Sequence, residues 1–434
     1  CLDGDAEFQS LSENLPPHDK SVTITKSQWE EYLFSRFNSA YDPACLATPP
    51  ESYFDEPISR YWINTSHNTY LTGDQLQSKS SVEAYTLSLY RGCKCLEIDC
   101  WDGSNNQAVV FHGHTLTTQI AFVDVLQVVK AYIQSHPSTL PIILSLENHC
   151  SHAVQSTMAS QLREVFGDAL YIPPLAELKK TGRLPSPNAL RGKVVIKGKR
   201  PPDPDEESPA GEKADNDDAP EGVTAIATAG SGDGDDEEED PYDDALESPS
   251  NKDKDKKKPK SKIASELASL TLFHGTKFKS FDKSLVSDSS HMHSIGETKI
   301  AKLLKSAENP KLWRKYNEEH LTRTYPAGVR VDSSNYNPIL AWAMGCQLVA
   351  LNFQAHDTSL ILNDGRFRQH GGCGYVLKPF IESGGRPSEP RTVQIQVISG
   401  HCLPKPRGAK VGEAIDPYVR VELHDVRTCA DGRE

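Results

Sequence analysis

Short apolar runs alternate with helix-like stretches between Pro57 and Arg200. The apolar runs predict strands at Tyr61–Asn64, Cys95–Asp99, Ala108–His112, Ile142–Leu146 and Val194–Lys197. Between them, a helical spacing of apolar residues predicts helices over Ser81–Leu89, Ile120–Gln134 and Ala153–Phe166. Strands that are apolar almost throughout and alternate with helices are typical of a parallel sheet covered by helices.

The alternation resumes in the second half of the chain. Residues Thr298–Ala307 and Ile339–Ala343 are predicted as helices, Gln347–Phe353 as a strand, and Gly371–Lys378 as a glycine loop that enters a strand. One strand–helix fold in two halves fits an α/β fold of the (β/α)₈ TIM-barrel type. A doubly wound open sheet is the competing topology, but no GxGxxG motif after a strand favours it.

Residues 201–262, between the two halves, differ sharply in composition. Residues 201–250 hold 19 Asp and Glu against one Lys, and residues 251–262 hold seven Lys against two Asp. Because few large apolar side chains are present to offset the entropy of ordering, we predict a disordered acidic insertion. These two tracts carry the whole formal net charge of −13, so the remainder is near neutral and does not indicate a nucleic-acid partner.

The two ends of the chain have their own patterns. Ser27–Phe37 is predicted as a short amphipathic helix, and the strict alternation in Thr392–Ile398 and Tyr418–Leu423 predicts antiparallel strands that begin a β-sandwich. The expected organisation therefore begins with a helical segment and linker (1–56) and a first barrel half (57–200). The insertion (201–262), a second barrel half (263–382) and a linker with a truncated sandwich (383–434) follow.

The chain begins with Cys1 and carries no visible signal peptide, so we expect a fragment of an intracellular protein. Its ten cysteines form no paired CxxC motif, which does not favour zinc and suits reduced core thiols. The longest apolar stretch, Ile339–Phe353, is interrupted by Gly345 and Gln347 and is shorter than the roughly 20 residues of a bilayer span. We expect a cytoplasmic protein whose membrane contact is peripheral.

Charged, amide and imidazole side chains follow successive predicted strands. They are His67, Asn68, Glu97, Asp99, His112, Glu147, Lys197 and Lys199. Residues two apart on a strand share a face, and the carboxyl ends of barrel strands open onto one surface. Each of these residues alone has an ordinary structural explanation, but their joint position at strand ends predicts a single site.

Each residue type in this set has a chemical use. The carboxylates and the Asn68 amide suit Ca²⁺, and Lys197 and Lys199 suit an anionic group such as phosphate. Two histidines suit proton transfer and stabilisation of developing charge. The combination indicates phosphodiester cleavage assisted by a metal ion.

At this point the chain resembles a known family, the eukaryotic phosphoinositide-specific phospholipases C. Motifs similar to its X half are Ser66–Leu71, Cys95–Gly103 and Leu144–Cys150, and motifs similar to its Y half are Tyr325–Gly328, Asp332–Tyr336 and Gly371–Pro379. The resemblance covers about residues 57–200 and 263–382 and is delta-like. Weaker likenesses, to an EF-hand remnant before the barrel and a C2 domain after it, complete the expected architecture.

The resemblance implies a role for each candidate residue. His67 matches the histidine that stabilises the pentacoordinate phosphorus, and His112 matches the general acid toward the diacylglycerol oxygen. Asn68, Glu97, Asp99 and Glu147 match the calcium ligands, and Glu147 or Glu97 matches a base toward the inositol 2-hydroxyl. The residues that match contacts to the substrate phosphates and the inositol ring are Lys197, Lys199, Ser294, Arg323 and Tyr325.

The expected function is calcium-dependent cleavage of phosphatidylinositol 4,5-bisphosphate to diacylglycerol and inositol 1,4,5-trisphosphate through a cyclic phosphodiester, at an anionic membrane surface. The alternatives are a catalytically silent phosphoinositide-binding scaffold and a calcium-dependent membrane adaptor acting through the C2-like end. The positions that match the family's apolar membrane rim are Leu76, His114, Leu116 and Val329, which include no Phe, Tyr or Trp. The resemblance also suggests that the acidic insertion is autoinhibitory; the upstream regulator is not indicated.

Overall fold

The computed structural model describes residues 25–27, 47–201, 263–276 and 278–379, together with positions scattered between 392 and 424. The chain divides into two compact units, residues 1–48 and residues 49–434. Of the predicted N-terminal helix only Ser27 is described, and it is helical. Of the predicted acidic insertion, residues 202–262 lie outside the described residues.

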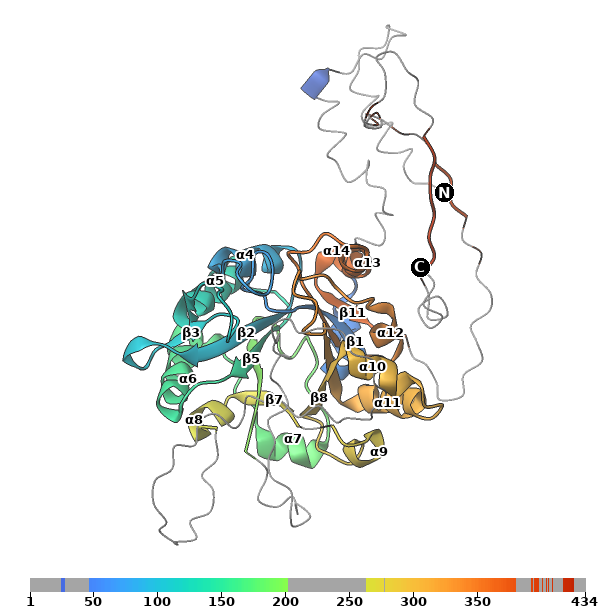
Figure 1. Cartoon of the computed structure of the whole chain (residues 1–434). Coiled ribbons are helices and arrows are strands. Elements are labelled where there is room, and N and C mark those ends of the chain that lie inside the picture. Colours follow the sequence, from blue (N-terminus) through green and yellow to red (C-terminus); the bar gives the residue numbers. More distant parts are fainter. Residues whose placement is uncertain are drawn as a thin grey trace, which may run out of the picture. The chain divides into compact units, whose positions relative to one another are not determined.

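Parallel strands from both halves of the chain close into one barrel (Figure 1). In order around the barrel they are β1 (Tyr61–Ser66), β2 (Cys95–Asp102), β5 (Ile142–Asn148), β6 (Val194–Gly198), β7 (Thr271–Gly275), β8 (His291–Gly296), β9 (Leu321–Tyr325) and β10 (Leu348–Leu351). β1 pairs with β10 on one side and with β2 on the other, which closes the ring. The predicted (β/α)₈ barrel is confirmed, and the open doubly wound sheet is wrong.

Short antiparallel strands extend this barrel at two places. β11 (Tyr375–Leu377) pairs with β1, and the hairpin of β3 (Ala108–Val110) and β4 (Ile120–Ala121) continues from β2. The prediction that residues 108–112 form a parallel barrel strand is therefore wrong. Residues 103–107 are too few for the crossover of about a dozen residues that parallel pairing requires, so the chain turns back beside β2.

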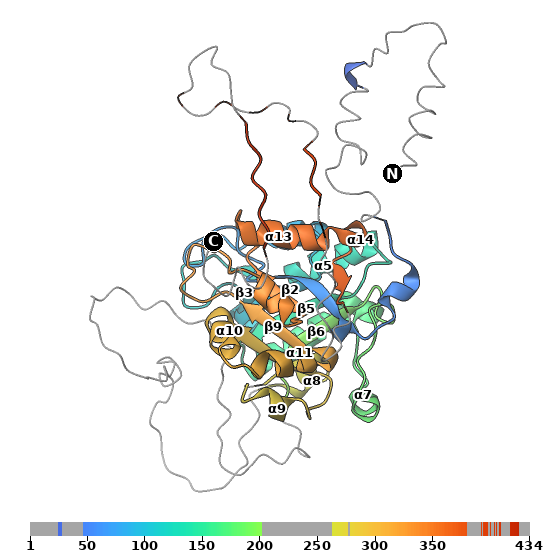
Figure 2. The same ribbon diagram turned by 90° about the vertical axis from the view of Figure 1, so that its right-hand side faces the viewer.

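Helices surround the strands, as Figures 1 and 2 show from two directions. They are α4 (Val82–Tyr90), α5 (Phe122–Ser135), α6 (His152–Phe166), α7 (Leu175–Thr181), α8 (Ser265–Ala268), α9 (Phe281–Ser284), α10 (Glu297–Leu304), α11 (Asn309–Glu319), α12 (Ile339–Ala343), α13 (Thr358–Phe367) and α14 (Gln369–Gly372). Short 3₁₀ turns η2 (Glu51–Phe54), η3 (Ile58–Arg60), η4 (Ser104–Asn106) and η5 (Gly167–Ala169) complete the described elements. Among these helices, none combines the length and apolar character that crossing a bilayer requires.

Side chains along β2 and its neighbouring strands alternate between the two faces of the barrel wall. Leu96 and Ile98 join the apolar cluster that also includes the inner faces of α5 and α6. Cys95 and Ile143, which face the other way, join a second apolar cluster at the amino end of the strands. Two residues further along the inward face of β2 comes Glu97. The barrel is thus apolar at one end and polar at the carboxyl end, where the predicted site lies.

The C-terminal sandwich stays a prediction. Residues 394–397 and 418–423 are described, and they take part in no strand pairing there. Two strands without the rest of a sandwich are marginal at best, because they have too little apolar surface to bury.

Candidate active site

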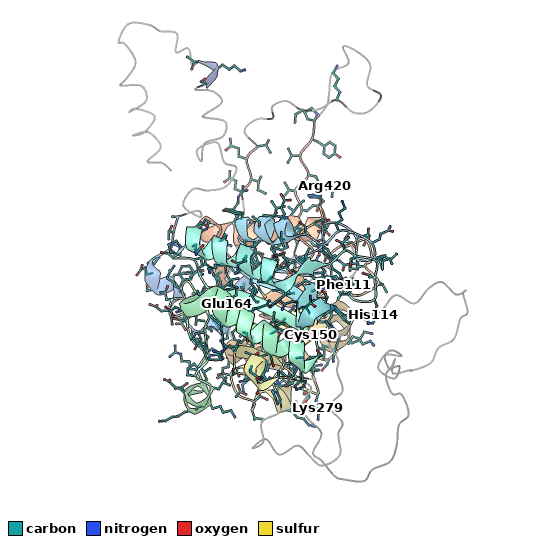
Figure 3. The ribbon with its side chains drawn as sticks, turned by 90° about the vertical axis from the view of Figure 1, so that its left-hand side faces the viewer. Phe111, His114, Cys150, Glu164, Lys279 and Arg420 are labelled. Atoms are coloured by element: carbon teal, nitrogen blue, oxygen red, sulfur yellow. The ribbon has the colours of Figure 1, made fainter. Side chains whose placement is uncertain are left out.

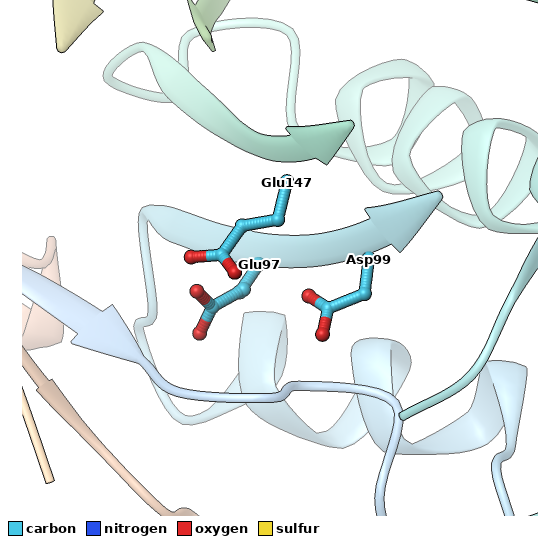
Figure 4. Close-up of side chains that lie close together, drawn as sticks. All are labelled: Glu97, Asp99 and Glu147. Atoms are coloured by element: carbon cyan, nitrogen blue, oxygen red, sulfur yellow. The ribbon is translucent and has the colours of Figure 1, made fainter. Parts of the chain in front are cut away.

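Three carboxylates lie together at the carboxyl end of the barrel. Glu97 and Asp99 share the inward face of β2, and the parallel register places Asp99 opposite Glu147 of β5. One carboxylate oxygen from each residue lies within 4.8 Å of the other two. Figure 4 shows the three side chains pointing into the same space. Tertiary structure therefore gathers the three predicted carboxylates into one cluster.

This cluster has the properties of a cation site. Burial, together with the charges of Glu147 and Glu97, raises the pKa of Asp99 well above its usual range. Burial and then Glu97 raise the pKa of Glu147 to about 7. One oxygen of Asp99, Oδ2, accepts a hydrogen bond from the Tyr70 hydroxyl at 2.7 Å, whereas the other, Oδ1, is buried with no hydrogen-bond partner. An unsatisfied buried carboxylate oxygen in an all-oxygen cluster fits Ca²⁺.

Asn68 lies beside these carboxylates because of an unusual backbone conformation. Its φ of 40° lies in the left-handed region, which asparagine tolerates better than most residues. The Asn68 backbone N–H donates to Oε2 of Glu97 at 2.8 Å, and its side-chain nitrogen donates to Oε1 of Gln75 at 2.8 Å. The side-chain oxygen is then the Asn68 atom suited to a cation.

Both candidate histidines use the same ring nitrogen to contact the protein. Nδ1 of His67 lies 2.9 Å from Oδ1 of Asn352, and Nδ1 of His112 lies 2.7 Å from the backbone oxygen of Gln75. Because both partners are acceptors, each Nδ1 carries the proton and each Nε2 is left for a ligand. Burial and then the positive charge of Arg323 lower the pKa of His67 to about 3, and burial lowers that of His112.

The basic candidates come from strands β6 and β9 of the barrel and from the residues after β6. Lys197 is buried on the inward face of β6, in register with Ser145, and Lys199 follows it half-buried. Arg323 of β9 is buried and hydrogen-bonded to Oε1 of Glu97, and its Nη1 lies 3.6 Å from Oε1 of Glu147. The guanidinium thus binds two of the carboxylates rather than standing apart from them, a pairing that the sequence did not predict.

Ser294 and Tyr325 flank Arg323. Ser294 is in register with Arg323 on the neighbouring strand, and its hydroxyl is buried with no hydrogen-bond partner. The Tyr325 ring centroid lies 5.3 Å from the guanidinium carbon of Arg323. An unsatisfied hydroxyl beside a cation is suited to an anionic ligand. The structure places Ser294 and Tyr325 next to Arg323, and their roles stay predictions.

Sequence reasoning missed three residues that hold the site in place. Tyr70 contacts Asp99, Asn352 contacts His67, and Gln75 contacts both Asn68 and His112. A signal for Asn352 was present, since it directly follows the apolar strand β10 as His67 follows β1. Gln75 lies in a loop with no such pattern, so only the structure reveals it.

The predicted rim residues are exposed on loops at this end of the barrel. Leu116 and Val329 are 83% and 80% exposed, and Leu76 is 37% exposed. His114 is also exposed, and its ring packs edge-on against Trp101 with 5.2 Å between ring centroids. Phe111 packs on the same indole, and Figure 3 shows Phe111 and His114 beside the hairpin. An aromatic ring thus lies next to the rim, although none of the four rim positions holds Phe, Tyr or Trp.

A barrel that gathers carboxylates and two histidines at its carboxyl end has an arrangement that suits a phosphodiesterase assisted by a metal ion. Comparison with known protein families then shows to which family the chain belongs. The profile of the phosphatidylinositol-specific phospholipase C X domain matches residues 54–200, and that of the Y domain matches residues 267–381. The chain belongs to the phosphoinositide-specific phospholipase C family, which confirms the resemblance seen in the sequence.

Relatives of delta type match along most of the chain. It is 42% identical over 414 residues to the Homo sapiens 1-phosphatidylinositol 4,5-bisphosphate phosphodiesterase delta-4, covering 91% of this chain and 51% of the relative. It is 35% identical over 446 residues to the Homo sapiens 1-phosphatidylinositol 4,5-bisphosphate phosphodiesterase delta-1. This match covers 98% of this chain and 55% of the relative. The chain thus spans about half the length of these curated relatives.

Solved structures are similar as well. The crystal structure of S. officinalis PLC21 superposes with a TM-score of 0.62 at 35% sequence identity, covering 83% of this chain and 42% of that one. The L. pealei PLC21 structure superposes with a TM-score of 0.61 at 32% sequence identity. The match covers 86% of this chain and 43% of that one. Both likenesses agree with the barrel described above.

Proposed function

We propose that this chain is the catalytic part of a calcium-dependent phospholipase C. Its substrate is phosphatidylinositol 4,5-bisphosphate and its products are diacylglycerol and inositol 1,4,5-trisphosphate. The single observation that carries the proposal is the convergence of Glu97, Asp99 and Glu147 with both histidines at one end of the barrel. The names of the delta-type relatives support the choice of substrate.

The first step uses the substrate's own 2-hydroxyl as the nucleophile. Asn68, Glu97, Asp99 and Glu147 would hold Ca²⁺, which when bound would lower the pKa of this hydroxyl and offset negative charge on the phosphate. Glu147 or Glu97 accepts the proton. The structure supports Glu147, because both oxygens of Glu97 already accept hydrogen bonds, from Asn68 and Arg323.

The two histidines act through Nε2. The negative charge of the bound substrate raises the pKa of each imidazole, which favours a proton on Nε2. His67 then donates to an oxygen on phosphorus and stabilises its added charge, while His112 gives its proton to the diacylglycerol oxygen. In the second step His112 Nε2 accepts a proton from water, whose oxygen bonds to phosphorus. The carboxylate base returns its proton to the departing inositol 2-oxygen, which opens the cyclic phosphodiester.

The remaining candidates bind the headgroup. Lys197, Lys199 and Ser294 are proposed to contact the 4- and 5-phosphates, and the Tyr325 ring packs on the inositol. Arg323 is engaged with Glu97 and Glu147, so its contact with a phosphate requires that these ion pairs loosen.

The direct test is release of water-soluble inositol phosphate from labelled phosphatidylinositol 4,5-bisphosphate. We expect release with micromolar to millimolar Ca²⁺ and its loss on adding a chelator, because the carboxylates repel one another without a cation. Restored release after excess Ca²⁺ is the control for damage to the protein. A chain that binds phosphoinositide but releases nothing at any calcium concentration would instead be the silent scaffold.

The exposed rim supports action at a membrane surface. Leu76, Leu116 and Val329 present apolar surface from loops next to the site, where a headgroup must enter. We propose an anionic membrane that contains phosphoinositides as the partner of this surface.

Deleting residues 201–262 is expected to raise hydrolysis on anionic vesicles several-fold. The acidic tract of this segment, with 19 Asp and Glu against one Lys in residues 201–250, opposes approach to a negatively charged surface. The comparison is made against vesicles of neutral carrier lipid with the same substrate content. The same rate for both proteins on both vesicles would remove the autoinhibitory role.

A further inference from the structure

We infer that Gln75 is a positioning residue that aligns both histidines and the metal ligand Asn68. The inference deepens the proposed function and rests on it. Gln75 is buried in the loop that follows β1. Its side-chain amide contacts Asn68 and Asn352, and its carbonyl oxygen contacts His112. The side chain of Gln75 is hydrogen-bonded to Asn68, and the backbone of Gln75 is hydrogen-bonded to His112. Among the described residues, Gln75 alone makes both contacts.

The side chain of Gln75 links Asn68 to His67. Its Oε1 accepts from Nδ2 of Asn68 at 2.8 Å, which turns the Asn68 oxygen toward a cation. Its Nε2 donates to Oδ1 of Asn352 at 3.2 Å, the same oxygen that accepts from Nδ1 of His67 at 2.9 Å. This donor identifies the Asn352 atom facing His67 as the oxygen, so His67 must carry its proton on Nδ1.

The backbone of Gln75 orients the second histidine. The Gln75 carbonyl oxygen lies 2.7 Å from Nδ1 of His112, which directs Nε2 away from the loop. Gln75 therefore takes part in setting which nitrogen of each imidazole is available and which atom of Asn68 can bind a cation. For His67 it acts together with the bond from Nδ2 of Asn352 to the Ser334 carbonyl oxygen at 3.4 Å. Contacts of this kind, one bond removed from ligands and reacting groups, are commonly worth 10- to 100-fold in activity or metal affinity.

The Gln75 loop is also tied to the loop after β9, which offers a matched control. Gln75 Nε2 donates to the Ser333 hydroxyl at 2.8 Å. Gln354 donates to the same hydroxyl and to the Gly73 carbonyl oxygen, both at 3.2 Å. Gln354 thus ties the same two loops together but makes no hydrogen bond to His67, Asn68 or His112 among those that the structure gives.

The test compares Gln75→Met with Gln354→Met in the full chain. Methionine keeps much of the side-chain volume and removes the amide groups. We expect Gln75→Met to lower kcat about 10- to 100-fold and to raise the half-activating calcium concentration several-fold. We expect Gln354→Met to change each value less than twofold. Equal effects of the two variants would reduce Gln75 to a loop tether, and wild-type values in Gln75→Met would overturn the inference.

Two readouts do not depend on activity. Calcium should raise the unfolding temperature of the wild type and raise that of Gln75→Met less. In the calcium-free protein labelled with ¹⁵N-histidine, His67 should carry its proton on Nδ1 in the wild type. This preference should weaken in Gln75→Met, where the 3.4 Å bond from Nδ2 of Asn352 to the Ser334 carbonyl oxygen is left to orient the amide. His112 should keep its tautomer in both, because its partner is a backbone oxygen. An unchanged His67 tautomer in the variant would contradict the inference.

A second variant covers the case in which Gln75→Met does not fold. Gln75→Glu keeps an acceptor for Asn68 but cannot donate to Asn352. We expect kcat to fall at least tenfold while the half-activating calcium concentration does not rise. Unchanged kcat in Gln75→Glu would overturn the His67 part of the inference. An inactive wild type would refute the proposed function itself, whereas an active wild type with insensitive Gln75 variants would refute this inference alone.

Discussion

Replacing His112 with alanine is expected to lower kcat for phosphatidylinositol 4,5-bisphosphate about 10²- to 10⁴-fold, the usual contribution of a general acid. The leaving alkoxide of diacylglycerol needs a proton, and the Nε2 atom of His112 is the proposed source. Because Nδ1 is bonded to the Gln75 carbonyl oxygen, the ring is held with Nε2 available. The measurement is steady-state release of inositol phosphate at saturating calcium.

A changed leaving group makes this prediction specific. An inositol phosphodiester with a phenol leaving group needs little protonation, so His112→Ala should cleave it with a much smaller loss of kcat. His67→Ala should be impaired on both substrates, because stabilising charge on phosphorus is needed in each case. The matched control is His136→Ala, an exposed histidine at the end of α5 and outside the site. Equal losses of His112→Ala on both substrates would contradict the general-acid role.

Acidification from pH 7 to pH 5 is expected to reduce the stability that a second group of histidines contributes to the barrel. His274, His291 and His293 lie on β7 and β8, away from the carboxylates, with 4.6 Å between the rings of His291 and His293. Burial is the main cause that lowers their pKa values, to about 3, 4 and 3. Nearby positive charge lowers two of these pKa values further. Arg200 lowers the pKa of His274, and His291 lowers that of His293.

The direction follows from proton uptake by the unfolded chain. Below about pH 6.5 the unfolded histidines bind protons, whereas the folded ones stay neutral until about pH 4 to 3. The stabilisation they contribute is therefore complete above pH 6.5 and is lost as the pH falls. Each histidine costs about 2 kcal/mol of unfolding free energy at pH 5, or about 6 kcal/mol for the three. The groups that face them include Asp288, which opposes the shifts of His274 and His291.

The measurement is urea unfolding at several pH values, with His293→Gln as the comparison. Glutamine keeps a polar partner for the Ser284 hydroxyl, which lies 2.7 Å from Nε2 of His293, but does not titrate. The raised pKa values of Asp99 and Glu147 work in the opposite direction in the wild type and in the variant. The difference between the two proteins should therefore shrink by about 2 kcal/mol from pH 7 to pH 5. A difference that does not depend on pH would refute the assignment.

Part of the fold and site was readable from local pattern. The alternation in β2 placed Leu96 and Ile98 on one face and Glu97 and Asp99 on the other, and the structure agrees. Strands β7, β8 and β9 were not predicted. Polar residues interrupt two of them, β8 (His291–Gly296) and β9 (Leu321–Tyr325). Those polar residues are inward candidates such as Arg323 or members of the histidine group. The strands without an apolar sequence pattern are thus those that carry site residues or members of the histidine group.

The sequence by itself determined the strand faces, the family and the set of candidate site residues, because strand periodicity and ordered motifs are local properties. Only the tertiary structure decided that the segment before His112 is antiparallel, that Arg323 binds Glu97, and that Gln75 and Asn352 hold the histidines. These contacts join residues up to 285 positions apart. They depend on the register in which the barrel closes, which no short stretch of chain encodes.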